Sequence, residues 1–191
     1  MRFGELMSKI GVKPIILPSE VKVDLAEGKV FIKGKDGEVD LGLLPKEIKL
    51  SVEQDKIYLK IPDDSNRKVK ALHGLYRSLI SNAVAGVQKI WEKKLEIVGT
   101  GFGVKPQGED LIFKIGYSHP VIFKKISGIK FSVDGNNKII ISGADKQLVG
   151  QTAYKIKKIK IPDVYKGKGI KYDGEILKIK PGKKAKTAET N

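Results

Sequence analysis

The chain has 191 residues and a formal net charge of +15, from 37 Lys and Arg against 22 Asp and Glu, which favours a polyanionic partner such as nucleic acid. Hydrophobic residues make up 40% of the chain, enough to build a core, so a wholly disordered basic protein is excluded. With no cysteine, the sequence excludes a disulfide framework, thiolate catalysis and a Cys-based zinc site, and its two histidines argue against a His-rich metal centre.

The N-terminal arm, residues 1–18, lacks the apolar run of a signal peptide. No stretch of the sequence approaches the roughly 18 consecutive apolar residues that a membrane-spanning helix needs. We therefore expect a soluble protein of the cytoplasm. Met7 offers an alternative start, which would make residues 1–6 an extension.

Residues 19–88 predict a first domain of strands followed by one helix. Apolar and polar residues alternate in short runs separated by turn residues, a pattern typical of antiparallel strands with one buried face, at 21–25, 30–32, 39–41, 48–52 and 57–61. After a polar break, apolar residues recur every three or four positions from Val69 to Val87, which predicts an amphipathic helix. We expect this helix to pack on the open face of the sheet.

Residues 89–160 repeat the same order in a second domain. Strands are predicted at 95–98, 103–105, 111–115, 121–123, 129–133 and 139–141, and a second helix begins near Asp145 and ends before Pro162. Ile-Lys-Leu-Ser-Val at 48–52 also matches Ile-Lys-Phe-Ser-Val at 129–133. The sequence therefore predicts an α+β fold with two tandem similar domains, each a small mostly antiparallel sheet packed on one helix, followed by a basic C-terminal tail at 161–191.

Positive charge is concentrated near the end of the chain. Residues 155–186 contain 12 lysines and three acidic residues, which leaves a net charge of +9. Lysines face outward from the apolar stripe of the second helix, and beyond Pro162 they are interleaved with glycine and tyrosine. Glycine lets a backbone approach a surface closely, tyrosine stacks or hydrogen-bonds to sugar and phosphate, and lysine suits phosphate contact. This mixture predicts a nucleic-acid-binding surface rather than a solvated tail.

The rest of the sequence carries no catalytic signature. The Gly99–Gly103 run, Gly-Thr-Gly-Phe-Gly, matches neither phosphate-binding glycine motif and lies between predicted strands, which favours turn glycines. His119 has no nucleophile or orienting acid near it in sequence, so we expect a hydrogen-bonding loop histidine. His73 is expected where the first helix meets its sheet. We predict no enzyme, no cofactor and no metal site.

The segment Pro162–Tyr172, Pro-Asp-Val-Tyr-Lys-Gly-Lys-Gly-Ile-Lys-Tyr, resembles the C-terminal signature of the large-ribosomal-subunit protein six family. The resemblance extends from about residue 7 to residue 180 and is supported by the runs at Ser8–Ile15, Gly116–Val121 and Gly143–Gln147. Asp163 and Val164 replace the family's usual Glu-Pro, and Lys171 replaces a frequent Arg, which loses a bidentate contact.

This resemblance implies a structural, non-catalytic protein of the large ribosomal subunit. It implies binding to 23S-type rRNA near the sarcin-ricin loop, with neighbouring ribosomal proteins and the docking region of translational GTPases close by. By resemblance, the rRNA-binding residues are Lys166, Gly167, Lys168, Gly169, Lys171 and Tyr172. Tyr165 is added as a tyrosine that flanks the loop and can stack or hydrogen-bond. Charge and position add Lys157, Lys158 and Lys160, and His119 and Lys146 are weaker candidates. Lys166, Lys168 and Lys171 are expected to be exposed, so that their replacement by Ala weakens rRNA binding without unfolding the protein.

Two other functions are weighed against this one. An enzyme that processes RNA or nucleotides at Gly99–Gly103 would need acids, metal ligands or a nucleophile around that loop. A membrane-surface module would need a bulky apolar face opposite the basic one, and the tail at 181–186 has none.

Overall fold

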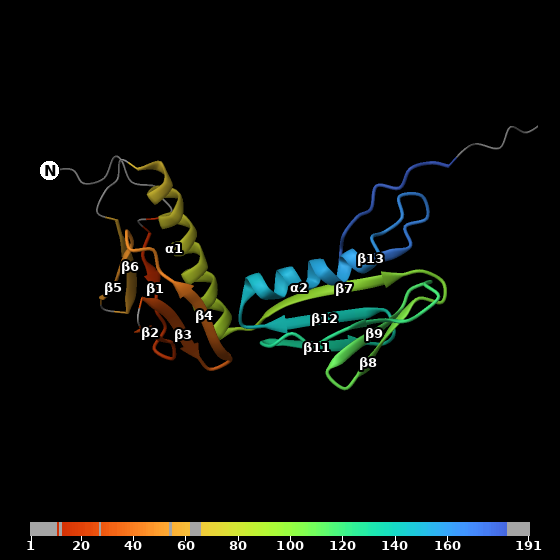
Figure 1. Cartoon of the computed structure of the whole chain (residues 1–191), viewed down its shortest axis with the longest axis horizontal. Helices are drawn as coiled ribbons and strands as arrows, with labels where there is room; N and C mark the ends of the chain where they lie inside the picture. The colour runs from red at the N-terminus through yellow and green to blue at the C-terminus, as the bar shows by residue number, and fades with distance from the viewer. Residues whose placement is uncertain (1–10, 12, 27, 54, 62–65, 183–191) are drawn as a thin grey trace, which may run out of the picture. The chain divides into compact units, whose positions relative to one another are not determined.

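The computed structural model describes residue 11 and residues 13–26, 28–53, 55–61 and 66–182 (Figure 1). The predictions for Met7, for residues 1–10 and for the lysines beyond residue 182 lie outside the described residues. The chain divides into two compact units, Met1–Trp91 with Gly143–Gln147 and Glu92–Ser142 with Leu148–Asn191. We call these the first unit and the second unit.

Among its described residues, the first unit has two three-stranded sheets and one helix, α1 (Arg67–Gln88). The sheets have the orders β1-β6-β5 and β2-β3-β4, and all neighbouring strands are antiparallel. Their strands are β1 (Ile15–Ile16), β2 (Lys22–Ala26), β3 (Lys29–Gly34), β4 (Gly37–Leu43), β5 (Lys49–Glu53) and β6 (Lys56–Lys60). The alternating apolar residues of β3 and β6 are buried, as a period of two requires.

Helix α1 joins the two sheets of the first unit into one core. Asn66 caps its start, where the Asn66 side chain accepts a hydrogen bond of 3.0 Å from the Lys68 N–H. The apolar face buries residues that pack with both sheets, among them Ile80, Ala83, Val84 and Val87. His73 is also buried, and its Nε2 lies 2.9 Å from the Leu59 carbonyl oxygen of β6. The predicted position of His73 at the boundary between helix and sheet is confirmed.

The second unit, as far as residue 182, also has two sheets and a helix, α2 (Lys146–Ile159), whose first two residues group with the first unit. One sheet has the order β10-β9-β8 and the other β11-β12-β7-β13. The strands are β7 (Trp91–Val98), β8 (Gly103–Gln107), β9 (Asp110–Lys114), β10 (Val121–Phe123), β11 (Ile129–Asp134), β12 (Lys138–Gly143) and β13 (Gly169–Tyr172). Helix α2 lies along β7 and β12 (Figure 1) and buries Val149, Thr152, Ala153 and Ile156.

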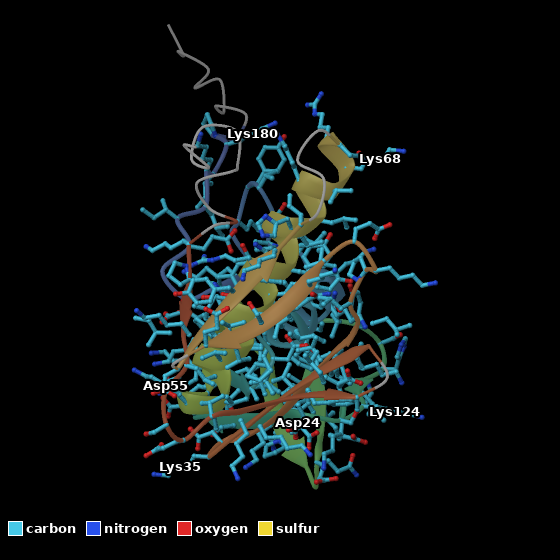
Figure 2. The ribbon with its side chains drawn as sticks, turned by 90° about the vertical axis from the view of Figure 1, so that its left-hand side faces the viewer. Asp24, Lys35, Asp55, Lys68, Lys124 and Lys180 are labelled. Atoms are coloured by element: carbon cyan, nitrogen blue, oxygen red, sulfur yellow. The ribbon has the colours of Figure 1, made fainter. Side chains whose placement is uncertain are left out.

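The α+β class, the repeated order of strands and helix, and the positions of both helices are confirmed. Each unit has two small sheets where the sequence predicts one. Ile15 and Ile16, expected in the arm, pair with β6, and β13, expected in the tail, pairs with β7. Charged side chains such as Lys35 and Lys124 are exposed on their units (Figure 2).

Candidate nucleic-acid interface

The candidate surface begins on helix α2. The Asp145 side chain accepts a hydrogen bond of 2.8 Å from the Gln147 N–H and caps the helix start. With one face buried in the core, Lys155 and Lys158 are exposed on the other, as predicted. The helix ends at Ile159, three residues before Pro162, which has no N–H for a helical hydrogen bond and disfavours helical backbone at the residue before it.

Asp163 organises the turn after the helix. Its N–H donates to the Lys168 carbonyl at 3.0 Å, and its own carbonyl accepts from the Gly167 N–H at 2.9 Å. Its carboxylate Oδ2 accepts a further hydrogen bond of 2.9 Å from the Lys166 N–H. These three bonds fix the backbone that carries Lys166 and Lys168. The Asp that replaces the family's usual Glu therefore has a local structural role.

The two glycines of the turn pack against the chain itself. Gly169 is buried with φ +152°, and a Cβ at this position would lie 2.6 Å from the Pro162 Cα. Gly167 is buried with φ +68°, and a Cβ there would lie 3.6 Å from the Ile179 side chain. In the described structure both glycines pack against residues of the same segment and shape the turn; a role in contact with a partner stays a prediction.

Strand β13 attaches the turn to the second unit. It pairs antiparallel with β7, with Gly169 opposite Val98 and Tyr172 opposite Leu95. The Ile170 N–H donates to the Lys160 carbonyl at 2.8 Å, and the Tyr172 N–H donates to Glu175 Oε2 at 2.9 Å. Since β13 is an edge strand, these two bonds occupy donors that could otherwise recruit another strand.

Lys157 and Glu175 form an ion pair that joins helix α2 to the chain just after β13. The Lys157 Nζ lies 2.6 Å from Glu175 Oε1 and 2.7 Å from Oε2, and the two side chains are 18% and 29% exposed. The same ammonium lies 4.5 Å from the centroid of the Tyr172 ring, a cation–π contact. The Lys157 ammonium, followed by the Tyr172 N–H, holds the pKa of Glu175 below its ordinary value of 4.5.

Lys171 is not the exposed residue that the sequence predicts. Its side chain is 23% exposed, and its Nζ lies 3.1 Å from Glu96 Oε2. The register of β13 and β7 causes this, because it places Lys171 directly opposite Glu96. The expectation of exposure is therefore confirmed for Lys166 and wrong for both Lys168 and Lys171, which are only partly exposed.

Several lysines of the segment keep accessible side chains. Lys158 and Lys166 are exposed and Lys168 is partly exposed, and none of them has an ion pair with another described residue. Tyr165, beside Lys166, is 58% exposed. Sequence reasoning did not single out three further exposed lysines, although its charge count contained them: Lys155, Lys178 and Lys180. Lys180 is held close to the turn, because its N–H donates to the Val164 carbonyl at 2.8 Å.

The loop that contains His119 lies beside the end of α2. The Tyr117 hydroxyl donates to the Ile159 carbonyl at 2.9 Å, and the Lys160 Nζ lies 4.6 Å from the centroid of the Tyr117 ring. His119 is exposed, and its Nδ1 lies 3.4 Å from the Ser118 hydroxyl. The structure thus brings the loop of His119 next to Lys160.

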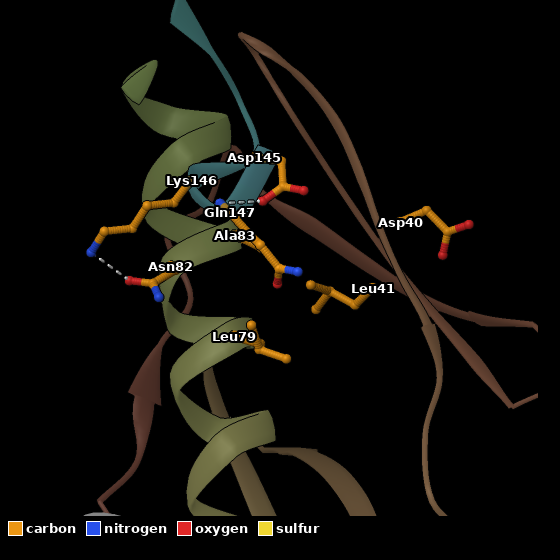
Figure 3. Close-up of a pocket in the computed structure, with 8 residues that line it drawn as sticks. All are labelled: Asp40, Leu41, Leu79, Asn82, Ala83, Asp145, Lys146 and Gln147. Carbon is orange, nitrogen blue, oxygen red and sulfur yellow. Dashed lines mark hydrogen bonds between the residues drawn. The ribbon is translucent and has the colours of Figure 1, made fainter. Parts of the chain in front are cut away.

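Lys146 belongs to a different site, within the first unit. Its Nζ donates to Asn82 Oδ1 at 3.2 Å and lies 4.4 Å from the centroid of the Trp91 ring. It lines a pocket of about 290 Å³ together with Asp40 and Leu41 of β4, residues of α1, and Asp145 and Gln147 (Figure 3). In that view the Lys146 ammonium is directed to Asn82, so its charge is already engaged within the protein.

The Gly99–Gly103 run forms the turn between β7 and β8, as predicted. Gly101 has φ +75°, which suits a turn, and the Phe102 ring occupies the space beside Gly99, where a Cβ would lie 2.5 Å from Phe102 Cδ2. With an aromatic ring in this position, the run does not form a phosphate-binding loop. No group of three or more potential metal-ligating side chains occurs among the described residues. Within the same residues, neither helix has the length and apolar character needed to cross a membrane.

Comparison with known proteins identifies the family. The family model described as ribosomal protein L6 matches residues 17–90 and 98–173. Similar proteins, each named large ribosomal subunit protein uL6, come from Caldicellulosiruptor saccharolyticus, with 46% identity over 94% of this chain and 98% of the relative, and from Synechococcus sp. (strain JA-3-3Ab), with 43% identity over 94% and 98%. The protein of the same name from Halothermothrix orenii is 42% identical over 93% of this chain and 99% of its own length. The chain belongs to the ribosomal protein L6 family, a family of structural ribosomal proteins and not of enzymes.

Proposed function

We propose that this protein is a structural constituent of the large ribosomal subunit that binds 23S-type rRNA through the C-terminal segment of its second unit, residues 155–180. The observation that carries the proposal is the set of accessible lysines, above all Lys158, Lys166 and Lys168, on a turn whose backbone is fixed by its own hydrogen bonds. The protein works in the cytoplasm, as part of the ribosome.

The physical basis of this binding is electrostatic. Lysines that neutralise phosphates release condensed counterions, and this release dominates sequence-independent affinity for nucleic acid. A folded turn holds its lysines in register without a large loss of backbone entropy on binding. Tyr165 adds an exposed ring that can stack on a base or a sugar.

The residues of the surface have different roles in this proposal. Lys158, Lys166, Lys168 and Tyr165 contact the RNA, while Gly167 and Gly169 shape the turn by packing inside it. Lys160 and His119 form an adjoining part of the surface, linked through Tyr117. Lys171 and Tyr172 support the segment from β13, and Lys146 stays outside the surface because Asn82 and Trp91 engage its ammonium.

The family resemblance supports a proposal for the position on the ribosome. We propose that the segment lies against rRNA near the sarcin-ricin loop, beside neighbouring ribosomal proteins and close to the region where translational GTPases dock.

The test is equilibrium binding of the full chain to purified large-subunit rRNA at several salt concentrations. The double variant Lys166→Ala/Lys168→Ala should weaken binding and reduce the slope of log affinity against log salt by about two, one for each lost phosphate contact. The matched control is Lys105→Ala/Lys124→Ala, which removes the same charge from exposed positions elsewhere in the second unit. Equal losses in both double variants would show only a general effect of charge and would refute this site.

A further inference from the structure

Glu175 is an acidic residue in the most basic part of the chain. A carboxylate next to an RNA phosphate is repelled by it, so simple electrostatics favours its absence from this surface. Glu175 is nevertheless a central hydrogen-bonding group of the C-terminal segment. Its carboxylate accepts from the Lys157 ammonium at 2.6 and 2.7 Å and from the Tyr172 N–H at 2.9 Å. The Glu175 N–H also donates to the Tyr172 carbonyl at 3.0 Å.

These contacts join the two stems of the turn at 163–168. One stem is the end of helix α2, which carries Lys157, and the other is β13, which ends at Tyr172. Because Glu175 binds both, it adds a second tie between the stems to the bond from the Ile170 N–H to the Lys160 carbonyl, and it supports the position of Lys166 and Lys168 from below the turn. The Lys93 ammonium, 5.4 Å from the centroid of the Tyr172 ring, ties strand β7 to the same point.

Lys157 and its neighbour Lys158 therefore differ in kind. Both carboxylate oxygens of Glu175 contact the Lys157 ammonium, and the Tyr172 ring lies beside the same ammonium. Lys157 would have to break this ion pair before it could contact a phosphate. Lys158 is exposed and has no such partner among the described residues.

We propose that Glu175 and Lys157 are positioning residues for rRNA binding, which hold the turn of Lys166 and Lys168 in its binding conformation without touching the RNA. This inference rests on the proposed function. Charge alone predicts that removing the negative charge of Glu175 strengthens binding to a polyanion. This inference predicts the opposite, a loss of rRNA affinity. It also moves Lys157 from the RNA-contacting lysines to the supporting structure.

The first experiment measures the affinity of the full-length Glu175→Ala and Glu175→Gln variants for purified large-subunit rRNA. Glu175→Ala should bind about tenfold more weakly, because the turn must then be ordered during binding. Glu175→Gln keeps the shape and one acceptor oxygen, so it should lose less. Asp173→Ser is the matched control, because it removes one negative charge two residues away at an exposed position, and it should bind as tightly as the wild type or more tightly.

The second experiment separates positioning from contact through the salt dependence of binding. Lys166→Ala should reduce the slope of log affinity against log salt by about one, whereas Lys157→Ala should weaken binding and leave the slope unchanged. Amide hydrogen exchange on Glu175→Gln should show faster exchange at Tyr172, with Ile97 in the core of β7 unaffected; this locates the change and shows that the unit is folded.

Two results would overturn the inference: Glu175→Gln and Glu175→Ala binding as tightly as Asp173→Ser, or Lys157→Ala lowering the salt slope as much as Lys166→Ala. The proposed function fails separately. If the wild type does not bind the rRNA, or if Lys166→Ala/Lys168→Ala binds as well as the wild type, then the site itself is wrong and not only its support.

Discussion

The two units differ most in the segments that come after their helices. Helix α1 ends at Gln88 without a basic residue in its last turn, and the chain enters β7 at Trp91. Helix α2 ends with Lys157 and Lys158 in its last turn and continues into a further turn and the edge strand β13. Cations are favourable at a helix C-terminus, so α2 stabilises the charge that it presents. The shared sheets and helix provide a scaffold, and the proposed binding surface consists of the basic last turn of α2 together with the part of the second unit that is not repeated.

The largest expected effect comes from replacing a tightly packed glycine of the second unit, and the same kind of replacement in the first unit provides the comparison. In Gly169→Ala the new Cβ would lie 2.6 Å from the Pro162 Cα. The backbone of residue 169 also has a φ of +152°, which side chains other than glycine rarely adopt. We expect about 2–4 kcal/mol of destabilisation in the second unit, from backbone strain and overpacking together, and a loss of rRNA binding. Thermal unfolding and rRNA titration measure both effects.

Two variants are controls for this comparison. Gly34→Ala puts a Cβ 2.8 Å from the Val87 Cβ in the first unit, so it should cost about 1–3 kcal/mol there and leave rRNA affinity unchanged at temperatures where the protein is folded. Gly174→Ala adds a Cβ with no atom within 4 Å and should cost only about 1–2 kcal/mol, from its positive φ. If Gly34→Ala abolished rRNA binding as Gly169→Ala does, the assignment of binding to the second unit would be contradicted.

A smaller effect is expected from pH and belongs to the second unit. The pKa of Glu175 is lowered by the Lys157 ammonium and the Tyr172 N–H. The Glu175 carboxylate is therefore protonated more readily in the unfolded chain than in the folded one. The ion pair therefore stabilises the fold at pH values above the ordinary pKa of 4.5, and this contribution is lost as pH falls through the lower pKa of the folded state.

Urea unfolding of the wild type and of Glu175→Gln at several pH values measures this contribution. The difference in free energy of unfolding should be constant well above pH 4.5 and should shrink as the solution is acidified below it. The other acidic groups titrate alike in the two proteins, so their contributions to the free energy of unfolding cancel in this difference. A gap that stays the same into strong acid would mean that the Glu175 charge does not stabilise the fold.

The smallest effect concerns Lys146 in the first unit. Lys146→Met removes the cation–π contact with Trp91 and should cost about 0.5–1 kcal/mol of stability. Trp91 is the sole tryptophan of the chain, so its fluorescence reports this change directly. Binding to rRNA should not change, because the Lys146 charge is engaged within the protein. A loss of affinity equal to that of Lys166→Ala would add Lys146 to the binding surface.

Local patterns in the sequence were enough to predict most of the fold. The alternation at 57–61 and the spacing from Val69 to Val87 correspond to β6 and α1, because each depends on neighbouring residues and a single buried face. Strand β13 was not predicted, since Gly-Ile-Lys-Tyr is short and follows a run of glycine and lysine, and its partner β7 lies more than 70 positions away in sequence. The pairing of β1 with β6, which puts Ile15 opposite Ile57, likewise joins residues far apart in sequence.

The candidate site could be predicted as a segment but not residue by residue. Charge density correctly located the exposed lysines, because a run of lysines must face solvent or a polyanion. It did not distinguish Lys157 and Lys171, which are paired with acids, from Lys158 and Lys166, which are exposed. Glu175 and Glu96 are distant in sequence from the lysines that they bind, so only the folded register reveals the pairs.

Electron cryo-microscopy of the large ribosomal subunit that contains this chain tests the central claim most directly. Our account predicts the ammonium groups of Lys166 and Lys168 at about 3 Å from rRNA phosphate oxygens, a hydrogen-bonding distance, with Lys157 still on Glu175. A subunit in which rRNA contacts the first unit while residues 155–180 face open solvent would contradict it.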